Sequence, residues 1–292
     1  MANTKITNPE LFNLGANNTA ATQLPVMTAT QRIAMTGLSV GEMIFNSTTD
    51  KVEYWDGTKW YGITYAFAYP TSLKMYLDAS DTNSYPGTGT TWFDLTSNGN
   101  NGAINGASWN STGYFNFNGS SDYVDFGVYP FGTGQNISYS FWIRPSSANA
   151  DNDGVFLIYV PAANSHSPPY YSHCIALESS SSRLRLDYLT NNGSSQIKLE
   201  SGGSTLSLGS WNHYALTREN NIAKWYKNGV PTGALTNFGS ITTAFNATTG
   251  ITRVGSRVNT NHYEGFLSKL HVYDRGLTQA EVTALYNEGK GF

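Results

Sequence analysis

Residues 211–230 read WNHYALTRENNIAKWYKNGV, and the alternation within this stretch decides the fold. Two aromatic-rich runs flank the polar triplet 219–221, and the second run stops at Asn228-Gly229. An Asn-Gly pair readily supplies the positive φ angles that a tight turn needs. The side chains alternate between two faces along both runs, whereas a helix would repeat its apolar residues every 3.6 positions. The stretch therefore predicts a β-hairpin with one face packed against a second sheet.

The composition of the whole chain agrees with a large β-sheet protein. The 292 residues include 29 Gly and 40 aromatic residues (19 Tyr, 14 Phe and 7 Trp), and only 13% are charged. Short apolar runs separated by Gly, Asn, Ser and Thr predict an all-β sandwich with a sizeable core. Near the C-terminus, Thr278 and Glu281 form a capping-box pattern ahead of an apolar stripe, which predicts one short helix.

Charge and hydropathy argue against several classes of partner. The formal net charge is −3 and no basic cluster occurs, so we expect no nucleic-acid partner. The longest apolar runs fall well short of the ~20 residues of a membrane-spanning helix, so we expect no membrane insertion. The N-terminal residues lack a signal-peptide pattern, and the one cysteine, Cys174, cannot form an internal disulfide. Both features fit synthesis in a reducing cytoplasm.

The chain is expected to fold in four parts: an extended arm (1–25), a small β-meander for attachment (26–63), a linker (64–70) and the sandwich (71–292). The arm lacks apolar periodicity, and Asp56-Gly57 supplies a hairpin turn within the meander. A meander of this size buries too little apolar surface to be stable alone. We therefore expect it to pack against the larger domain or against copies of itself.

The residues from Thr71 to Phe292 resemble laminin-G-like, concanavalin A-type jelly-roll domains. The hairpin matches the order W-x-H-x-A followed by Y-x-N-G, and further pieces occur in the order that this family shows. They are LKMYLDAS (73–80), TTWFDLTSNGNNGAINGASW (90–109), FNFNGSSDYVDFG (115–127), ISYSFWIRP (137–145) and FLSKLHVYDRGLTQAEVTALYNEGKGF (266–292). The resemblance implies a two-sheet jelly-roll sandwich, whose members bind many ligands or serve as structure.

Residues 26–63 resemble a short module of bacteriophage tail-fibre and other virion proteins. The matching positions are Arg32, Gly41, Phe45, Asn46, Asp50, Tyr54, Trp55, Asp56, Gly57 and Trp60. This resemblance implies a place on the virion surface and contacts with other virion proteins through the arm and the module. It also implies a homotrimer, because such fibre modules usually share a core across a threefold axis. Assembly contacts are assigned to Arg32, Tyr54, Trp55 and Trp60.

The sequence lacks the catalytic motif of the glycosidases that share this fold. Glycosidases on this fold generally carry a strand motif E-x-D-x-x-E, which places acid, base and nucleophile on one face. No such motif occurs here, because Glu178, Glu200, Glu219 and Glu264 lack the neighbouring carboxylates. The histidines show no metal-ligand spacing. We therefore expect no enzymatic activity.

Calcium is the metal that the family resemblance implies, held at the rim of the sandwich by loop oxygens. The stretch 115–124 resembles the family signature F-(D/N)-G-x-x-D-Y-V, which makes Asn118 and Asp122 candidate ligands. A second candidate pair, Asp151 and Asp153, lies in an acidic stretch that resembles the start of a calcium loop. At both places the alternative is a polar turn that these residues cap.

Carbohydrate is the ligand that the aromatic residues favour, because rings stack on the apolar faces of sugars while amides bind hydroxyls. His166, Tyr170 and Tyr171 lie together in a Pro-containing insertion, and Trp142 lies on the strand face opposite Phe141. For Trp142 the alternative is packing on the other covered side of the sheet.

The sequence as a whole predicts a non-enzymatic bacteriophage virion protein that displays a lectin-like sandwich and binds host-surface carbohydrate. Two alternatives stay open. One is a structural decoration or fibre subunit that binds no glycan. The other is a capsule-degrading enzyme, which would need a cleft with two carboxylates about 5–9 Å apart.

Overall fold

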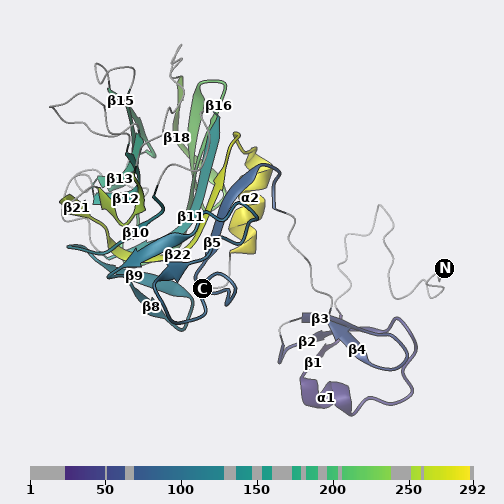
Figure 1. Ribbon diagram of the computed structural model, residues 1–292. Coiled ribbons are helices and arrows are strands. Elements are labelled where there is room, and N and C mark those ends of the chain that lie inside the picture. Colours follow the sequence, from purple (N-terminus) through teal and green to yellow (C-terminus); the bar gives the residue numbers. More distant parts are fainter. Residues whose placement is uncertain are drawn as a thin grey trace. The chain divides into compact units, whose positions relative to one another are not determined.

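The computed structural model describes residues 24–49, 51–62, 69–127, 136–146, 153–159, 173–178, 182–189, 196–202, 206–237, 251–257 and 260–289. The chain divides into two compact units, Met1–Ala68 and Tyr69–Phe292 (Figure 1). The predicted extended arm lies outside the described residues except for Leu24 and Pro25.

The first unit contains a four-stranded sheet in the order β1-β2-β3-β4. Its strands are β1 (Val26–Met27), β2 (Met43–Asn46), β3 (Lys51–Trp55) and β4 (Trp60–Gly62). Strands β2 to β4 form the antiparallel meander that the sequence predicts, and β1 adds in parallel to β2. The short helix α1 (Ala29–Ile33) was not predicted. A capping box between Thr28 and Gln31 holds it, and none of its residues is buried, so no apolar stripe marks it in the sequence.

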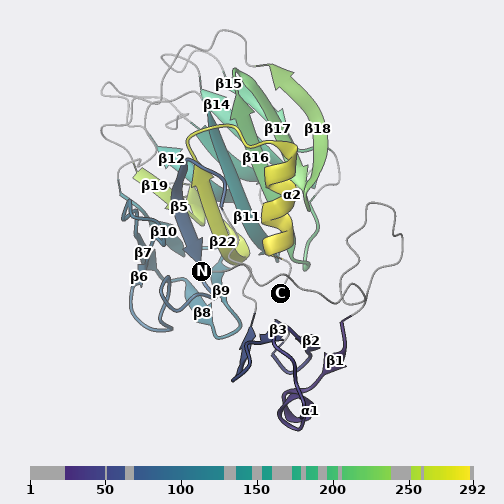
Figure 2. The same ribbon diagram turned by 90° about the vertical axis from the view of Figure 1, so that its right-hand side faces the viewer.

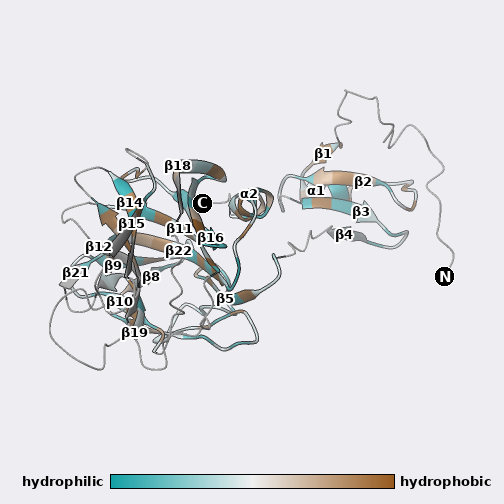
Figure 3. Cartoon of the chain, turned by 90° about the horizontal axis from the view of Figure 1, so that it is seen from above, coloured by the Kyte–Doolittle hydropathy of each residue, from teal (hydrophilic) through white to brown (hydrophobic). Residues whose placement is uncertain are grey.

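Little apolar surface is buried inside this first unit. Ile44 of the largely hydrophobic β2 is 1% exposed, and the other apolar residues described there are less buried (Figure 3). A polar network completes the interior: Arg32 pairs with Glu53 at 2.6 Å, and Asn46 donates to the same carboxylate at 3.0 Å. Ile33 and Val40 remain 76% and 72% exposed. The unit therefore leaves apolar surface uncovered.

The second unit is built from two sheets that face one another (Figure 1). The helix-side sheet has the order β18-β17-β16-β11-β22-β9-β8, with β5 also paired to β22. Its strands are β5 (Leu73–Asp78), β8 (Ser108–Asn110), β9 (Tyr114–Asn118), β11 (Ile137–Pro145), β16 (Asn212–Glu219), β17 (Ile222–Lys227), β18 (Val230–Asn237) and β22 (Glu264–Tyr273).

The far sheet has the order β15-β14-β13-β12-β19-β10-β7-β6, and β20 and β21 extend it beside β12. Its strands are β6 (Thr91–Trp92), β7 (Gly102–Asn105), β10 (Tyr123–Asp125), β12 (Asp153–Tyr159), β13 (His173–Glu178), β14 (Arg183–Leu189), β15 (Gln196–Glu200), β19 (Ile251–Val254), β20 (Ser256–Arg257) and β21 (Thr260–His262). Neighbouring strands of this sheet are antiparallel except that β12 and β21 run parallel.

Strands β16 and β17 form the predicted hairpin, in which Glu219 is paired with Ile222. Asn220 and Asn221 both adopt positive φ angles, 47° and 67°, as the two central residues of a tight hairpin turn require. Asn228 and Gly229 repeat this device between β17 and β18, at 51° and 76°. These turns match the right-handed twist of the strands that they join, which fixes the register of both hairpins.

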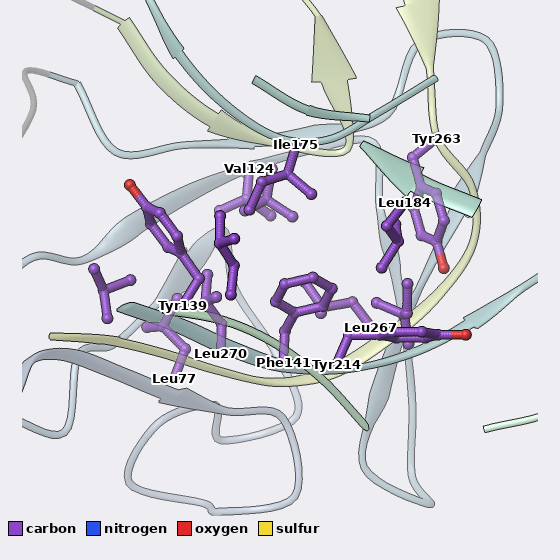
Figure 4. Close-up of a cluster of buried hydrophobic side chains, with 14 of the residues drawn as sticks. Leu77, Val124, Tyr139, Phe141, Ile175, Leu184, Tyr214, Tyr263, Leu267 and Leu270 are labelled. Atoms are coloured by element: carbon purple, nitrogen blue, oxygen red, sulfur yellow. The ribbon is translucent and has the colours of Figure 1, made fainter. Parts of the chain in front are cut away.

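The core lies between the two sheets (Figure 4). Tyr139 and Phe141 of β11 and Tyr214 of β16 point from the helix-side sheet toward Ile175 and Leu184 of the far sheet. All five belong to one cluster of buried apolar side chains. The alternation along residues 137–145 thus directs its aromatic residues as the sequence predicts.

Helix α2 (Gln279–Glu288) lies across the outer face of the helix-side sheet (Figure 2). It begins with the predicted capping box, in which Thr278 and Glu281 exchange hydrogen bonds. Val282 and Leu285 are buried on the sheet, and Thr283 donates to the Gly229 carbonyl at 3.1 Å. The predicted fold class, an all-β two-sheet sandwich with one short C-terminal helix and a small N-terminal β-meander, is confirmed.

Candidate functional site

The outer face of the helix-side sheet divides into two parts. Alternation along β11 places Trp142 and Arg144 on this face, next to residues of β16 and β22. The ring, ion-pair and hydrogen-bond partners of α2 lie around Trp142, Lys269 and Gly229, and we call this region the covered part. The region around Arg144 is the open part, where the residues are only half-buried.

Trp142, a predicted sugar-stacking residue, lies in the covered part and is 6% exposed. Its ring stacks on Tyr286 of α2 with centroids 5.7 Å apart and an interplanar angle of 20°. The His213 ring lies 5.5 Å from it on the neighbouring strand. Since these contacts cover the indole, a packing role replaces the predicted ligand-binding role of Trp142.

Two buried histidines lie in the same covered part. The Ser140 hydroxyl lies 2.8 Å from Nε2 of His213, as in a nucleophile–base pair. Both residues are buried, and Nδ1 of His213 has no hydrogen-bond partner to orient the ring. Burial lowers the pKa of His213 to about 3 and, with help from the Lys269 charge, lowers the pKa of His271 to about 3. Neutral imidazoles enclosed in this way are structural groups.

The one lysine of the covered part is neutralised by two carboxylates. Lys269 lies 3.2 Å from Asp78 and 3.0 Å from Glu288 of α2. Burial by itself raises the pKa of Asp78, but the Lys269 charge and hydrogen bonds from Ser80 outweigh it, so the pKa lies below its usual value. Tyr76 also donates to Asp78 at 2.9 Å. The charges beneath the helix are therefore satisfied within the protein.

The open part is organised around Arg144. Its guanidinium carbon lies 4.0 Å from the ring centroid of Phe266 and 5.7 Å from those of Tyr114 and Trp211. The ring centroid of Tyr114 lies 5.2 Å from that of Phe266, with the rings edge to face, and 5.7 Å from that of Trp211, with the rings tilted. We call Tyr114, Arg144, Trp211 and Phe266 the Arg144 platform; all four are half-buried.

Arg144 carries its charge without a counter-ion. In the described part of the chain, no carboxylate lies within ion-pair distance of it, and its buried Nε has no hydrogen-bond partner. Exposed polar groups lie beside the platform, because Phe266 is opposite Asn116, which in turn is opposite Ser108. The surface thus combines ring faces, a cation and an amide, the groups with which proteins bind sugars.

The platform is assembled from distant pieces of sequence. Tyr114 begins β9, Arg144 lies near the end of β11, Trp211 precedes β16 and Phe266 lies on β22. Sequence reasoning missed these four as a site. The alternation of 137–145 does place Arg144 on the face of Trp142, but the neighbours of Arg144 depend on strand order.

The predicted calcium ligands Asn118 and Asp122 serve a turn instead. Oδ1 of Asn118 accepts hydrogen bonds from the backbone of Ser120 and Ser121 at 2.8 and 2.9 Å. Asp122 is buried, and its Oδ2 accepts from the Asn118 backbone at 3.0 Å. Within the described ranges, no group of three or more His, Cys, Asp or Glu residues is placed to hold a metal ion. In the structure these oxygens accept the hydrogen bonds of a turn, as the alternative interpretation predicts.

The other predicted ligand residues fall outside what the structure describes. Asp151, His166, Tyr170 and Tyr171 lie in undescribed segments, and only the backbone of Asp153, at the start of β12, is described. Their roles stay predictions.

The predicted assembly residues occupy the first unit. Arg32 pairs with Glu53 inside that unit. Tyr54 is half-exposed and stacks on Tyr61 with centroids 5.7 Å apart, and the rings of Trp55 and Trp60 are also 5.7 Å apart. Tyr54 is therefore the most exposed member of this set, while Arg32, Trp55 and Trp60 are half-buried.

Three of the four glutamates considered for catalysis are engaged in structural contacts. Glu178 pairs with Arg183 and Arg185, and Glu200 pairs with Arg183 at 2.7 Å. Glu219 accepts hydrogen bonds from Asn136 at 2.9 Å and from the backbone of Gly276 at 2.6 Å. These carboxylates stabilise strands and loops in the described structure.

A second arginine stacked on an aromatic ring lies on the far sheet. Arg253 lies 4.1 Å from the ring centroid of Tyr123 and pairs with Asp125 at 2.9 Å. It therefore resembles Arg144 in its stacking and differs in having a counter-ion.

Comparisons with known proteins agree with this architecture. A family model described as the concanavalin A-like lectin/glucanases superfamily matches residues 118–283, more than half of the chain. No curated protein matches the sequence. Nor does any helix in the described ranges have the length and apolar character to cross a membrane.

Solved structures share the fold at low sequence identity. A Trypanosoma rangeli sialidase in complex with sialic acid aligns over 75% of this chain and 33% of its own, with 16% identity and a TM-score of 0.55. The ligand-binding domain of botulinum neurotoxin serotype D, in complex with N-acetylneuraminic acid, aligns over 75% and 51%, with 15% identity and a TM-score of 0.55.

Domain 4 of the arabinanase AbnA from Geobacillus stearothermophilus, in complex with arabinotriose, aligns over 74% of this chain and 98% of its own. Its identity is 19% and its TM-score is 0.52. The chain thus spans almost the whole of the arabinanase domain, but only a third of the sialidase and about half of the neurotoxin domain.

Proposed function

The chain belongs to the concanavalin A-like lectin/glucanase superfamily, and on this premise we propose that it is a non-enzymatic carbohydrate-binding protein of a bacteriophage virion. The observation that carries the binding function is the Arg144 platform. Tyr114, Trp211 and Phe266 gather half-buried around one cation on the part of the sheet that α2 leaves open.

The platform has the composition that sugar binding needs. Aromatic rings stack on the apolar faces of sugar rings, and nearby polar groups bind the hydroxyls. The rings of Tyr114 and Phe266 are held by edge-to-face packing, so binding does not need to order them. Exposed Asn116 adds an amide next to Phe266. Structures that share the fold were solved with sialic acid and arabinotriose, which supports a saccharide ligand.

The absence of catalysis is part of the proposal. Glu178, Glu200 and Glu219 are each bound to arginines or to donors of neighbouring loops. A glycosidase instead keeps two carboxylates free on either side of the scissile bond.

The virion location rests on the first unit and its resemblance to tail-fibre modules. That unit leaves Ile33 and Val40 exposed and buries little apolar surface of its own. Copies of the same chain would cover such surface, and the proposed assembly is a homotrimer. Exposed Tyr54 is the residue best placed to contribute to that interface. The arm is proposed to bind other virion proteins.

Binding of the full-length chain to arrayed saccharides and to host-surface polysaccharides tests the proposal, with calcium present and then with a chelator. We expect Trp211→Ala to weaken binding about tenfold. Tyr123→Ala is the matched control, since that ring also stacks on an arginine but lies on the far sheet. Loss on adding chelator would show that a divalent cation takes part in binding, and Asp151→Ala with Asp153→Ala would then test the predicted loop.

A folded chain that binds no saccharide would overturn the binding function and favour a structural decoration or fibre subunit. Loss of binding only after Tyr170→Ala and Tyr171→Ala would move the site to that insertion. Release of shortened saccharides from an incubated polysaccharide would contradict the non-enzymatic proposal.

A further inference from the structure

We infer that the Arg144 platform selects acidic saccharides, with the guanidinium of Arg144 binding the carboxylate of a sugar residue. This inference deepens the function proposed above and rests on it. It narrows the proposed ligand from saccharides in general to those that carry a carboxylate.

The first observation is that Arg144 lacks a counter-ion in the described structure, whereas most other half-buried or buried arginines have a carboxylate beside them. Most half-buried or buried cations of the described structure pair with carboxylates: Arg32 with Glu53, Lys74 with Asp274, Arg183 and Arg185 with Glu178, Arg253 with Asp125, Lys269 with Asp78, and Arg275 with Glu281. Lys224 and Lys227 have no carboxylate partner among the described residues, and Lys227 donates instead to the Ser207 hydroxyl at 2.8 Å. Arg144 is half-buried like most of the paired cations, yet its charge is compensated only by ring faces.

The second observation concerns the hydrogen bonds of the same side chain. Nε of Arg144 is buried with no partner, and removing such a donor from water costs free energy unless a hydrogen bond replaces the lost one. An arginine donates through nitrogens in a planar fork that matches both oxygens of a carboxylate. A bound carboxylate would therefore compensate the charge of the guanidinium and accept hydrogen bonds from its terminal nitrogens.

The rings around Arg144 hold the fork in place before a ligand arrives. Phe266 at 4.0 Å and Tyr114 and Trp211 at 5.7 Å surround the guanidinium through cation–π contacts. A fixed donor loses little entropy on binding, so charge recognition at this place is efficient. Lysine would lack the planar fork, and glutamine would lack the charge.

The same rings give the selectivity for a sugar acid over a simple anion. A carboxylate on a pyranose ring lies close to the apolar C–H groups of that ring, which the aromatic faces are placed to contact. Asn116, exposed beside Phe266, is within the same surface and offers both a donor and an acceptor for hydroxyls. The cation, the rings and the amide together are complementary to a uronic or sialic acid residue.

Calorimetry on the full-length chain tests this inference with matched probes. One probe is a hexasaccharide of alternating glucuronate and hexosamine, and the second is its carboxyl-reduced form, in which each carboxylate becomes a hydroxymethyl group. A third is a hexasaccharide that has no carboxylates and carries sulfate esters as its only charged groups. An array of neutral and acidic saccharides, including sialylated ones, precedes calorimetry so that the best-bound backbone is used for the matched probes.

We expect the carboxylated probe to bind about tenfold more tightly than its reduced form, and the difference to shrink as salt rises. Arg144→Gln should abolish the difference, and Arg144→Lys should restore only part of it. Arg253→Gln, which removes a stacked arginine that already has a counter-ion, should leave the difference unchanged.

A second variant avoids any change to the packed guanidinium. Asn116→Asp places a carboxylate on an exposed position next to the platform and should weaken the acidic probe while sparing the reduced one. Equal binding of both probes would overturn the acidic selectivity and leave carbohydrate binding in place, as would preference for the sulfated probe. Absence of binding to every saccharide would overturn the proposed function itself.

Discussion

Lys269 and Arg144 stand on the same outer face of one sheet, on the neighbouring strands β22 and β11, and their surroundings differ completely. Lys269 is buried between Asp78 and Glu288, the second of which α2 supplies. Arg144 has three aromatic rings around it and no carboxylate in the described structure. Where the helix closes the sheet, charges have to be compensated from within; where it does not, a ligand can compensate them.

Two tryptophans repeat this difference. Trp142 is stacked beneath Tyr286 of α2, and Trp211 lies half-buried beside Arg144. A buried indole contributes mainly to stability, while an accessible one contributes mainly to binding. The comparison therefore predicts opposite consequences for the same substitution.

The largest effect is expected from Trp142→Ala. It should lower the free energy of unfolding by about 3–5 kcal/mol, because it empties a packed site under α2. Trp211→Ala should lower it by only about 1 kcal/mol. Urea unfolding measures both, and saccharide binding of the folded protein should show the reverse order. Equal destabilisation by the two variants would contradict the division of the face into covered and open parts.

The next effect concerns the charges beneath the helix. Asp78→Ala should destabilise the protein by about 3 kcal/mol, since Lys269 would lose its partner on the sheet, the more deeply buried of its two carboxylates. Combining Asp78→Ala with Lys269→Met should recover part of the loss, because no unpaired charge then remains buried. A double variant no more stable than the single one would show that packing, and not charge, holds this region.

Acidification should destabilise the protein through the two buried histidines of the covered part. The pKa values of His213 and His271 lie at about 3 in the folded protein, below the unfolded value of 6.5. Between these values the unfolded chain binds more protons, so stability is fully present above pH 6.5 and falls as pH decreases. Each histidine contributes about 1.4 kcal/mol per pH unit in this window.

Unfolding measured from pH 7 to pH 4.5 checks this prediction. The groups that face His271 act in opposite directions, since Lys269 lowers its pKa and Asp78 raises it. Replacing His213 and His271 by Asn and Phe should flatten the profile above pH 4.5, where carboxylates still contribute little. An unchanged slope in that variant would contradict the assignment.

The sequence predicted those features that depend on neighbours along the chain. The turn at Asn228-Gly229, the alternation of β11 and the capping box at Thr278 are local, and each follows from the residues themselves. The Arg144 platform is not local: it requires β9, β11 and β22 to lie side by side in register. Alternation along the sequence could place Trp142 and Arg144 on one face. It could not show that α2 covers Trp142 and leaves Arg144 accessible, because that depends on where the helix packs.

The candidate site shows the same limit. The stretch at Asn118 and Asp122 matches a calcium-loop signature, and the same residue types also make a turn in which backbone donors use their oxygens. Residue identity does not distinguish the two outcomes, because both need short oxygen-bearing side chains after a strand.

The smallest expected effect tests whether α2 only covers its part of the face or also shapes the open part. Thr278→Ala removes the cap of α2 and should cost about 1 kcal/mol of stability without changing saccharide affinity. Thr28→Ala removes the matching capping box of α1 in the first unit, so it is the control for any general effect of losing a cap. If Thr278→Ala weakens saccharide binding while Thr28→Ala does not, the helix holds the Arg144 platform in place through β11, and the two parts of the face act as one.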